Sequence, residues 1–502
     1  MERRPINKWL IALTVMLPTI MEIMDTTIVN VSLPHIQGGL SVGVDEVTWV
    51  LTSYLVSNAI VIPITGWLAS VFGRKRYLIF CITFFTLSSF MCGSANTLGM
   101  LVFFRVIQGL AGGGLQPISQ AILLETFPKE EHGMAMAAWG TGIVFAPILG
   151  PVLGGWITEN WSWPWIFYIN IPIGTISIVL TMLFIFDPPY LKRKFLSIDY
   201  IGLVLLAVGI GCLQIVLNKG QRKDWFSSHF IVSLSIIAAI FLILLVIREL
   251  LYKEPVINLR VFKDRSYATG TFVIFLYFFC FFGSVVLLPL YVQKLMGYTA
   301  FLAGLVLAPG ATASLLFFPL VGKLTQKLDN RYLLGIGLSI TAYSIYLMSQ
   351  FNLSAGFWNI VWPRALQGVG MAFLQVPLTV VTFVGIKKED MGNATSIFNL
   401  LRNLGSSFGI AFITTVFERR AQFHQTQLVT HLTPTDIPLQ HACETLKHLL
   451  PEDMVLGSIY NELLRQALML SFNDAFYILS IFVLCLLPSL LIFKRIKRVS
   501  HA

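Results

Sequence analysis

Two acidic residues, Glu22 and Asp25, stand inside a long apolar segment near the start of the chain. Of the 25 acids in the sequence, these are the two that lie deep within such a segment. A charged side chain at the centre of a membrane-spanning helix costs about 2.5–3.5 kcal/mol on insertion scales, so an acid there is a functional candidate. Residues three apart share a helix face. The pattern predicts a proton-coupling or substrate-binding role for both acids, and it leaves open which of them titrates.

A basic partner for these acids is Arg105, in another apolar segment. Asp25 is about 12 Å and Arg105 about 10 Å from the outer end of its predicted helix, at 1.5 Å per residue. The two charged groups are therefore expected at matching depth. Arg105 would then couple to proton movement by favouring release from the acid. The alternative is a static ion pair that only fixes the packing of two helices.

Other polar side chains in apolar segments are candidates for substrate binding: Gln108, Gln116, Gln375, Asn399 and Arg402. The four amides could line a cavity or form hydrogen bonds between helices. Arg402 has no acid near it in the second part of the chain to pair with. It could contact an anionic group of a substrate or donate to carbonyl groups at a helix break.

The elements that must position these residues are membrane-spanning helices. The 502 residues are 56% hydrophobic and only 12% charged, with a mean hydropathy of +0.76, whereas soluble proteins are roughly 25% charged. This composition excludes a soluble enzyme. Since about 20 apolar residues cross a bilayer, we expect an all-α polytopic protein with fourteen spans: 9–33, 47–69, 77–95, 98–121, 134–157, 165–187, 197–217, 229–250, 268–291, 301–323, 331–350, 358–383, 392–417 and 471–493.

The orientation follows from Lys and Arg residues, which favour cytoplasmic loops. With a cytoplasmic N-terminus, 24 of the 35 Lys and Arg residues fall on inner segments, eight on outer segments and three within spans. Both termini are therefore expected in the cytoplasm, with the chain in the inner membrane. Topology explains the net charge of +10, so nucleic acid is excluded as a partner. The loop from Lys219 to Asp224 is an exception to this rule.

Two motifs recur along the chain at nearly one offset. Arg105-Val-Ile-Gln108-Gly109 reappears 259 residues later as Arg364-Ala-Leu-Gln367-Gly368, and Gly66-Trp-Leu68 reappears 256 residues later as Gly322-Lys-Leu324. The repeat predicts two related six-helix halves, residues 1–190 and 256–502, with two inserted helices in 191–255. Paired repeats are the architecture of secondary transporters, whose substrate site lies near the midplane.

Several motifs are absent from the sequence. It holds no Gly-rich loop ending in Gly-Lys-Ser/Thr, no metalloprotease motif and no Gly-x-Ser-x-Gly. We therefore expect no enzyme activity, no metal and no cofactor, with transport driven by a proton gradient.

The motifs together resemble the major facilitator superfamily, and within it the fourteen-helix drug:proton antiporters of the EmrB/QacA type. Met24–Pro34 resembles that family's helix 1 motif, in which the Asp takes part in proton coupling, and Arg105, Gln108 and Gly109 fit its helix 4 motif. The stretch from Gly66 to Lys75 is similar to its loop motif, with Ser70 where the family has Asp. The resemblance assigns gating roles in that loop to Gly66, Gly73, Arg74 and Lys75.

A small-residue helix carries the resemblance that bears on direction of transport. Gly142, Ala146, Gly150 and Gly154 recur every four residues and form one smooth stripe, which lets helix backbones approach closely. The stretch that holds Pro147, Gly150, Pro151, Gly154 and Gly155 is similar to the helix 5 motif of antiporters rather than importers.

The resemblance implies a proton-coupled, alternating-access multidrug efflux transporter for hydrophobic or amphipathic small molecules, of the kind that confers antibiotic resistance. The alternatives are a proton symporter that imports a small solute and a non-transporting membrane receptor. An outer loop is expected at 418–470, with short amphipathic helices near 446–450 and 459–465. EmrB-like members use such a loop in a tripartite system, so it would bind a periplasmic adaptor protein or else only cap the outer gate.

Overall fold

The computed structural model describes residues 7–187, 199–252, 255–430, 432–433, 436–449 and 451–493. Across these ranges the chain forms nineteen α-helices and short 3₁₀ segments, with no strand. Thirteen of the described helices are long and apolar enough to cross a membrane. They match thirteen of the expected spans. The remaining expected span, 331–350, forms α15 (Asn330–Met348), whose polar first turn lowers its mean hydropathy but which packs between α16 and α19.

The first half is built from ten helices in the described ranges, two of whose spans are interrupted. The span from Leu98 breaks at three consecutive glycines, residues 112–114, because glycine is a weak helix former. The span from Trp49 narrows to a 3₁₀ turn at Pro63. The helices are α1 (Lys8–Leu40), α2 (Val44–Val47), α3 (Trp49–Val61), α4 (Thr65–Phe72), α5 (Arg74–Gly93), α6 (Leu98–Gly112), α7 (Leu115–Thr126), α8 (His132–Asn160), α9 (Trp165–Tyr168) and α10 (Asn170–Phe184).

The second half repeats the helix packing of the first. In the described ranges, α1 packs on α8 as α13 packs on α17, α3 on α6 as α14 on α16, and α5 on α10 as α15 on α19. The predicted bounds at 190 and 255 fall within or beside parts of the chain outside the described ranges, and they stay predictions. The helices are α11 (Tyr200–Lys219), α12 (His229–Leu251), α13 (Arg265–Lys294), α14 (Ala300–Lys327), α16 (Phe357–Phe383), α17 (Met391–Thr430), α18 (Ile437–Lys447) and α19 (Glu452–Leu484), in addition to α15.

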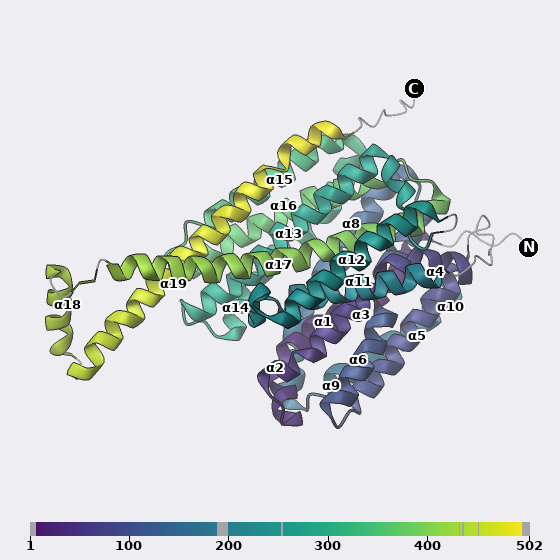
Figure 1. Ribbon diagram of the computed structural model, residues 1–502. Coiled ribbons are helices and arrows are strands. Elements are labelled where there is room, and N and C mark those ends of the chain that lie inside the picture. The colour runs from purple at the N-terminus through teal and green to yellow at the C-terminus, as the bar shows by residue number, and fades with distance from the viewer. Residues whose placement is uncertain are drawn as a thin grey trace, which may run out of the picture.

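The bundle has two distinct ends. Helix α1 begins and α19 finishes at one of them, here termed the terminal end, while α18 lies far out at the other, termed the α18 end (Figure 1). Lys8 at the start of α1 pairs with Glu131 before α8. Arg331 at the start of α15 donates to the backbone oxygen of Phe493. These contacts join the short connections at the terminal end.

The predicted outer loop at 418–470 is instead mostly helical. Helix α17 continues to Thr430 and α19 starts at Glu452, so both extend beyond the bundle and α18 joins them (Figure 1). Residues 459–465 therefore lie inside α19, and 446–449 lie at and just beyond the end of α18, rather than in separate short helices. Arg420 and His424 of α17 bind Asp474 of α19 at 2.6 and 2.7 Å. Such contacts between the two long helices are not visible in the hydropathy pattern.

The inserted helices connect both halves. Helix α11 packs on α3 and on α17, and α12 packs on α11. The Lys219 ammonium, at the end of α11, donates to the backbone oxygen of Asp45 at 3.4 Å and contacts Thr48. Trp225 Nε1 donates to Thr415 of α17 at 2.9 Å. Polar groups of the first half thus bind the ammonium of Lys219, in the loop that is the exception to the charge rule.

Candidate functional site

Asp25 and Arg105 form an ion pair inside the first half. Arg105 Nη1 lies 2.6 Å from Asp25 Oδ2, and both side chains are fully buried. Arg105 Nε donates to the backbone oxygen of Val50 at 3.2 Å, and its guanidinium carbon lies 4.2 Å from the centroid of the Tyr54 ring. The two charged groups lie at matching depth, as predicted, although α1 runs to Leu40 rather than to 33.

Two amides complete the shell around Asp25. Its Oδ1 accepts from Gln108 Nε2 at 3.1 Å and from Asn170 Nδ2 at 2.7 Å. Gln108 also accepts from Arg105 at 2.8 Å, so the predicted helix 4 residues act on one carboxylate. Charge-assisted hydrogen bonds of this kind are roughly twice as strong as neutral ones. The first half therefore surrounds the carboxyl group of Asp25 with one guanidinium and two amides that donate to it.

Glu22 lies one helical turn away, in a different environment. Its Oε1 accepts from Tyr54 at 3.2 Å and from Asn58 at 3.0 Å, and its Oε2 accepts from Gln116 Nε2 at 2.6 Å. Glu22 as a whole is 97% buried. Among the described residues, no Lys or Arg forms a salt bridge with it. Glu22 is therefore held by neutral donors, whereas Asp25 is held by a guanidinium.

The amide of Gln116 joins the two halves. Its nitrogen donates to Glu22 of α1, and its oxygen accepts from Arg402 Nη2 of α17. Arg402 is only 8% exposed, and its Nη1 has no hydrogen-bond partner among the described residues. In a second hydrogen bond between the halves, Asn399 Nδ2 donates to Gln120 Oε1 at 2.6 Å.

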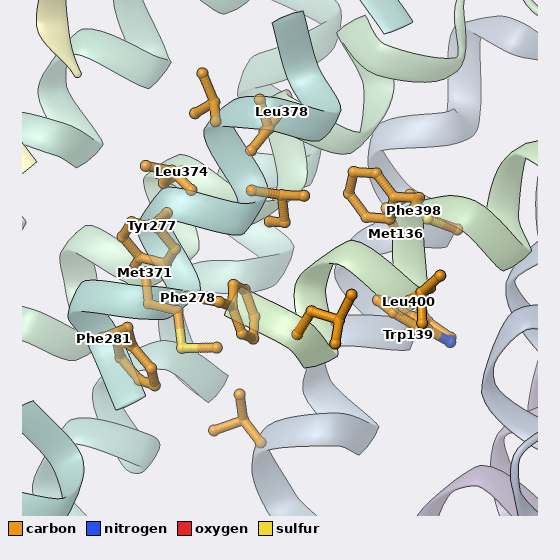
Figure 2. Close-up of a cluster of buried hydrophobic side chains, with 14 of the residues drawn as sticks. Met136, Trp139, Tyr277, Phe278, Phe281, Met371, Leu374, Leu378, Phe398 and Leu400 are labelled. Atoms are coloured by element: carbon orange, nitrogen blue, oxygen red, sulfur yellow. The ribbon is translucent and has the colours of Figure 1, made fainter. Parts of the chain in front are cut away.

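Figure 2 shows an apolar cluster at the boundary between the halves, and two of its rings lie beside Arg402. The guanidinium carbon of Arg402 lies 5.1 Å from the Trp139 ring and 5.6 Å from the Phe278 ring. Gln375 of α16 is also buried, and its Oε1 has no partner in the described part of the chain. A mostly apolar surface with a few polar groups is typical of sites for small organic ligands. The labelled members are Met136, Trp139, Tyr277, Phe278, Phe281, Met371, Leu374, Leu378, Phe398 and Leu400.

The small-residue stripe of α8 packs against α1, the helix that carries both acids. A Cβ atom added at Gly142 would lie 2.5 Å from Met16, one at Gly150 would lie 2.0 Å from Thr27 Oγ1, and one at Gly154 would lie 3.2 Å from the backbone of Ile28. The stripe therefore fixes how closely α1 approaches α8. Gly155 faces open space. Pro147 is exposed, and the side chain of Pro151 lies outside the description.

Two glycines allow the halves to touch at the terminal end. The Gly66 N–H of α4 donates to Ser396 Oγ of α17 at 2.9 Å, and an added Cβ would lie 2.6 Å from the Asn393 backbone. Its repeat counterpart, Gly322 of α14, faces α8, where an added Cβ would lie 2.9 Å from Ala137. The two contacts are related by the internal repeat.

The remaining loop-motif residues fix the start of α5. Gly73 has a φ of +86°, which favours glycine, and an added Cβ would lie 2.6 Å from Asp187. Asp187 follows α10 and accepts from the Lys75 N–H at 2.9 Å. Arg74 pairs with Glu125 of α7. A carboxylate that follows α10 and another that belongs to α7 thus bind the start of α5. The loop motif itself has Ser70, in α4, at the position where the family has Asp.

The family is decided by a match across most of the chain. Residues 15–410 match the model of the Major Facilitator Superfamily. The chain belongs to this superfamily. Its members are transporters rather than enzymes, and the chain is accordingly a multi-pass protein of the inner membrane. No group of three His, Cys, Asp or Glu side chains in the described ranges is placed to hold a metal.

Several relatives within the superfamily are multidrug exporters by name. The chain is 41% identical to the multidrug export protein EmrB of Haemophilus influenzae over 426 residues, which cover 85% of this chain and 83% of that protein. It is 37% identical to the fatty acid resistance protein FarB of Neisseria gonorrhoeae over 487 residues, covering 95% and 94%.

Solved structures of the superfamily share the fold. The human organic anion transporter MFSD10 superposes with a TM-score of 0.62 at 14% identity, covering 96% of this chain and all of that one. The proton:xylose symporter XylE superposes with a TM-score of 0.59 at 13% identity, covering 96% and 94%. The MFS fold is thus shown by structure as well as by sequence.

Sequence reasoning missed several residues of this superfamily member's site. Asn170, Asn58 and Tyr54 donate to the two acids, but the prediction weighed glutamines and one asparagine elsewhere. The usable signal was an asparagine within an apolar span, since such residues need a partner in the membrane. Trp139 carried no signal, because a tryptophan in a span is ordinary.

Proposed function

We propose that the protein is a proton-coupled exporter of hydrophobic or amphipathic small molecules that works by alternating access. The observation that carries the proposal is the hydrogen-bonded link from Glu22 through Gln116 to Arg402. It joins a buried carboxyl group of one half to a buried guanidinium of the other. The names of the EmrB and FarB relatives support the substrate class and the outward direction.

Glu22 is proposed as the acid that loads and releases the proton during turnover. Its donors are neutral, so protonation breaks no ion pair, whereas protonation of Asp25 would leave the Arg105 charge buried without a counterion. Buried charges without partners are strongly destabilising. Asp25 and Arg105 then act as a fixed pair that orients α1 and responds to the charge on Glu22.

Protonation of Glu22 would weaken the link between the halves. The neutral acid accepts less well from the Gln116 amide, and its own O–H competes for an acceptor. The Gln116 oxygen that holds Arg402 is then free to turn away. Arg402 would in turn bind a polar or anionic group of the substrate, whose apolar body would lie against Trp139 and Phe278.

The terminal end is proposed to face the cytoplasm, with both chain termini. The excess of Lys and Arg on inner segments supports this orientation. Close contacts at Gly66 and Gly322 join the halves at that end. They support a conformation closed towards the cytoplasm, in which the central site opens outward.

The end of α17, α18 and the start of α19 form a projection within residues 418–470, here termed the α18 hairpin. It is proposed to bind a periplasmic adaptor protein. It extends away from the bundle instead of folding over its end (Figure 1), which disfavours a role as a cap of the outer gate. Large apolar side chains on it are exposed, including Ile437 at 67%, Leu449 at 74% and Leu456 at 69%. Exposed apolar clusters on a soluble projection are typical of binding surfaces. A photocrosslinker at position 456 should capture one envelope protein in intact cells. If a variant that still exports captured no envelope protein from position 456 or from position 437, the hairpin would not have this role.

Transport itself is tested in everted vesicles with an acidified lumen. Hydrophobic cationic, neutral and anionic compounds are added in turn while lumenal pH is followed. We expect added substrate to raise lumenal pH in the wild type, and Glu22→Gln to lose this response. Glu249→Gln is the matched control, because Glu249 is a buried acid of α12 outside the two-half boundary.

The alternatives give different results in the same assay. A symporter that imports its solute would release both solute and protons from the lumen, so labelled compound would leave the vesicles instead of accumulating. A receptor would bind compounds without any proton movement in wild type or variants. Retained coupling in Glu22→Gln, with loss in Asp25→Asn, would transfer the proton role to Asp25.

A further inference from the structure

The second half contains a close counterpart of the Asp25 site. Arg364 Nη1 donates to Gln367 Oε1, as Arg105 donates to Gln108. Gln367 Nε2 then donates to Ser284 Oγ at 2.7 Å, where Gln108 donates to Asp25. Ser284 stands 259 residues after Asp25, the same offset that separates the two arginines. A serine therefore occupies the place of the carboxylate.

Among the described residues, no carboxylate pairs with the guanidinium of Arg364. The sequence contains no Asp or Glu in residues 265–328, 330–388 or 391–417, which include α13 to α16 and much of α17. None of the described acids forms a salt bridge with Arg364. Its side chain is 93% buried, and its Nε has no hydrogen-bond partner among the described residues. Arg105, in contrast, is neutralised by Asp25.

The guanidinium of Arg364 packs between α14 and an aromatic ring of α13. Its Nε faces α14 at Gly310, where an added Cβ would lie only 2.8 Å away. Its guanidinium carbon lies 5.5 Å from the Phe281 ring. Phe281 packs on Phe278 at 6.2 Å, and Phe278 also packs on Arg402. The charged group therefore adjoins the apolar cluster of Figure 2.

A buried guanidinium inside a membrane is costly unless an anion balances it. We propose that Arg364, Ser284 and Gln367 form a binding site for a monovalent anion, which supplies the charge that Asp25 supplies in the first half. The anion is the carboxylate of an amphipathic solute, whose chain lies against Phe281 and Phe278, or a free halide. The donors are the guanidinium N–H groups of Arg364, since the Ser284 hydroxyl donates to the backbone oxygen of Phe281 at 2.7 Å.

This inference deepens the proposed export function by naming a substrate class, and it rests on that function only for the movement of the bound anion. Binding is therefore measured without transport. Equilibrium binding of labelled decanoate is measured on the purified full-length chain in detergent, below the micellar concentration of decanoate. Chloride is added as a competitor, and thermal unfolding is followed with chloride alone.

The key comparison is Ser284→Asp with Ser284→Asn, which differ in charge and little in shape. An aspartate at 284 would pair with Arg364 and repel an anion, so we expect decanoate affinity to fall about tenfold or more, while Ser284→Asn stays within about threefold of wild type. Arg364→Gln should lose binding with Ser284 intact. Raised thermal stability of Ser284→Asp would show that this variant folds.

The experiments with chloride distinguish the two sources of the anion, the carboxylate of a solute and a free halide. If chloride alone stabilises the wild type but not Ser284→Asp, and competes with decanoate, the site binds a free halide as well. If only decanoate binds, the anion is the solute. Equal decanoate and chloride effects in Ser284→Asp and Ser284→Asn would overturn the inference, as would no binding of either anion by the wild type. The proposed export function is tested separately. It would be overturned if neutral and cationic compounds caused no release of protons from the lumen of everted vesicles that contain the wild type.

Discussion

Arg402 of the second half donates from its Nη2 to the side-chain oxygen of Gln116 in the first half. Because the nitrogen of the same amide donates to Glu22, one side chain connects this acid to the other half. The Asp25–Arg105 pair lies wholly within the first half. In the proposed transport cycle the two halves move apart, which would break the Gln116 link but would leave the Asp25–Arg105 pair intact.

Replacement of Gln116 by Leu should uncouple the halves. The change leaves Glu22 Oε2 and Arg402 Nη2 buried without this partner, which costs about 1–3 kcal/mol of stability per unsatisfied group. We expect a lower thermal unfolding temperature and substrate-induced proton release reduced to a small fraction. Gln120→Leu is the control, since it removes the side-chain hydrogen bond between Asn399 and Gln120 across the halves without touching Glu22. Equal loss of coupling in both variants would mean that contact between the halves, and not the Glu22 link, matters.

A double-mutant cycle on Asp25 and Arg105 separates a coupling role from a structural one. Each single change, Asp25→Asn or Arg105→Gln, leaves a buried charge without its partner and should cost about 3–5 kcal/mol. The double variant removes both charges and should be more stable than either single variant, as measured by unfolding in detergent. If the pair takes part in coupling, the double variant regains stability without regaining substrate-induced proton release. Recovery of both would show that the pair only fixes packing.

The glycine stripe gives a prediction with a control on the same helix. Gly150→Ala places a methyl group against Thr27 of α1, whereas Gly155→Ala places it in open space. Overpacking typically costs about 1–3 kcal/mol, so in a chain of this length Gly150→Ala should lower the unfolding temperature by roughly 1–3 °C. It should also reduce transport by shifting the helix that carries both acids. Gly155→Ala should behave as the wild type. A tolerated Gly150→Ala would mean that α1 and α8 are not held this closely during turnover.

Asp199 gives a prediction about pH at the terminal end, outside the spans. Burial opposes its ionised form, but the Arg248 guanidinium at 2.7 Å and the Gly202 N–H together hold the pKa of Asp199 below its ordinary value. A lowered pKa in the folded state means a contribution to stability that is complete above the ordinary pKa of about 3.9 and is lost as pH falls through the folded value. Thermal unfolding should therefore show wild type more stable than Asp199→Asn at pH 5–7, with the two converging in stronger acid. A difference that persists at low pH would assign the effect to packing instead.

Much of the fold was predictable because membrane insertion imposes a strong local rule. Spans such as 229–250 are long apolar runs, and α12 matches that range within two residues. The helical extensions of α17 and α19 were not predictable in the same way, since beyond the membrane their sequence is polar. There, packing contacts such as Arg420 with Asp474 stabilise the helices.

The candidate site was predicted in part. Glu22, Asp25 and Arg105 were identifiable because an ionised group in an apolar span is costly and therefore rare. Their donors Asn58 and Asn170 are neutral, and neutral polar residues are common enough in spans that no pattern selects them.

The sequence by itself determined the number of spans, the internal repeat and the presence of two acids and three arginines within the membrane. Each of these follows from composition along a single helix or from comparison of the chain with itself. Only the tertiary structure decided the individual contacts: Arg105 pairs with Asp25 and not with Glu22, and Glu22 binds Gln116. Arg364 binds Gln367, which in turn binds a serine, Ser284, instead of an acid. Partner choice depends on helix rotation and on contacts between segments far apart in the chain, to which local hydropathy is insensitive.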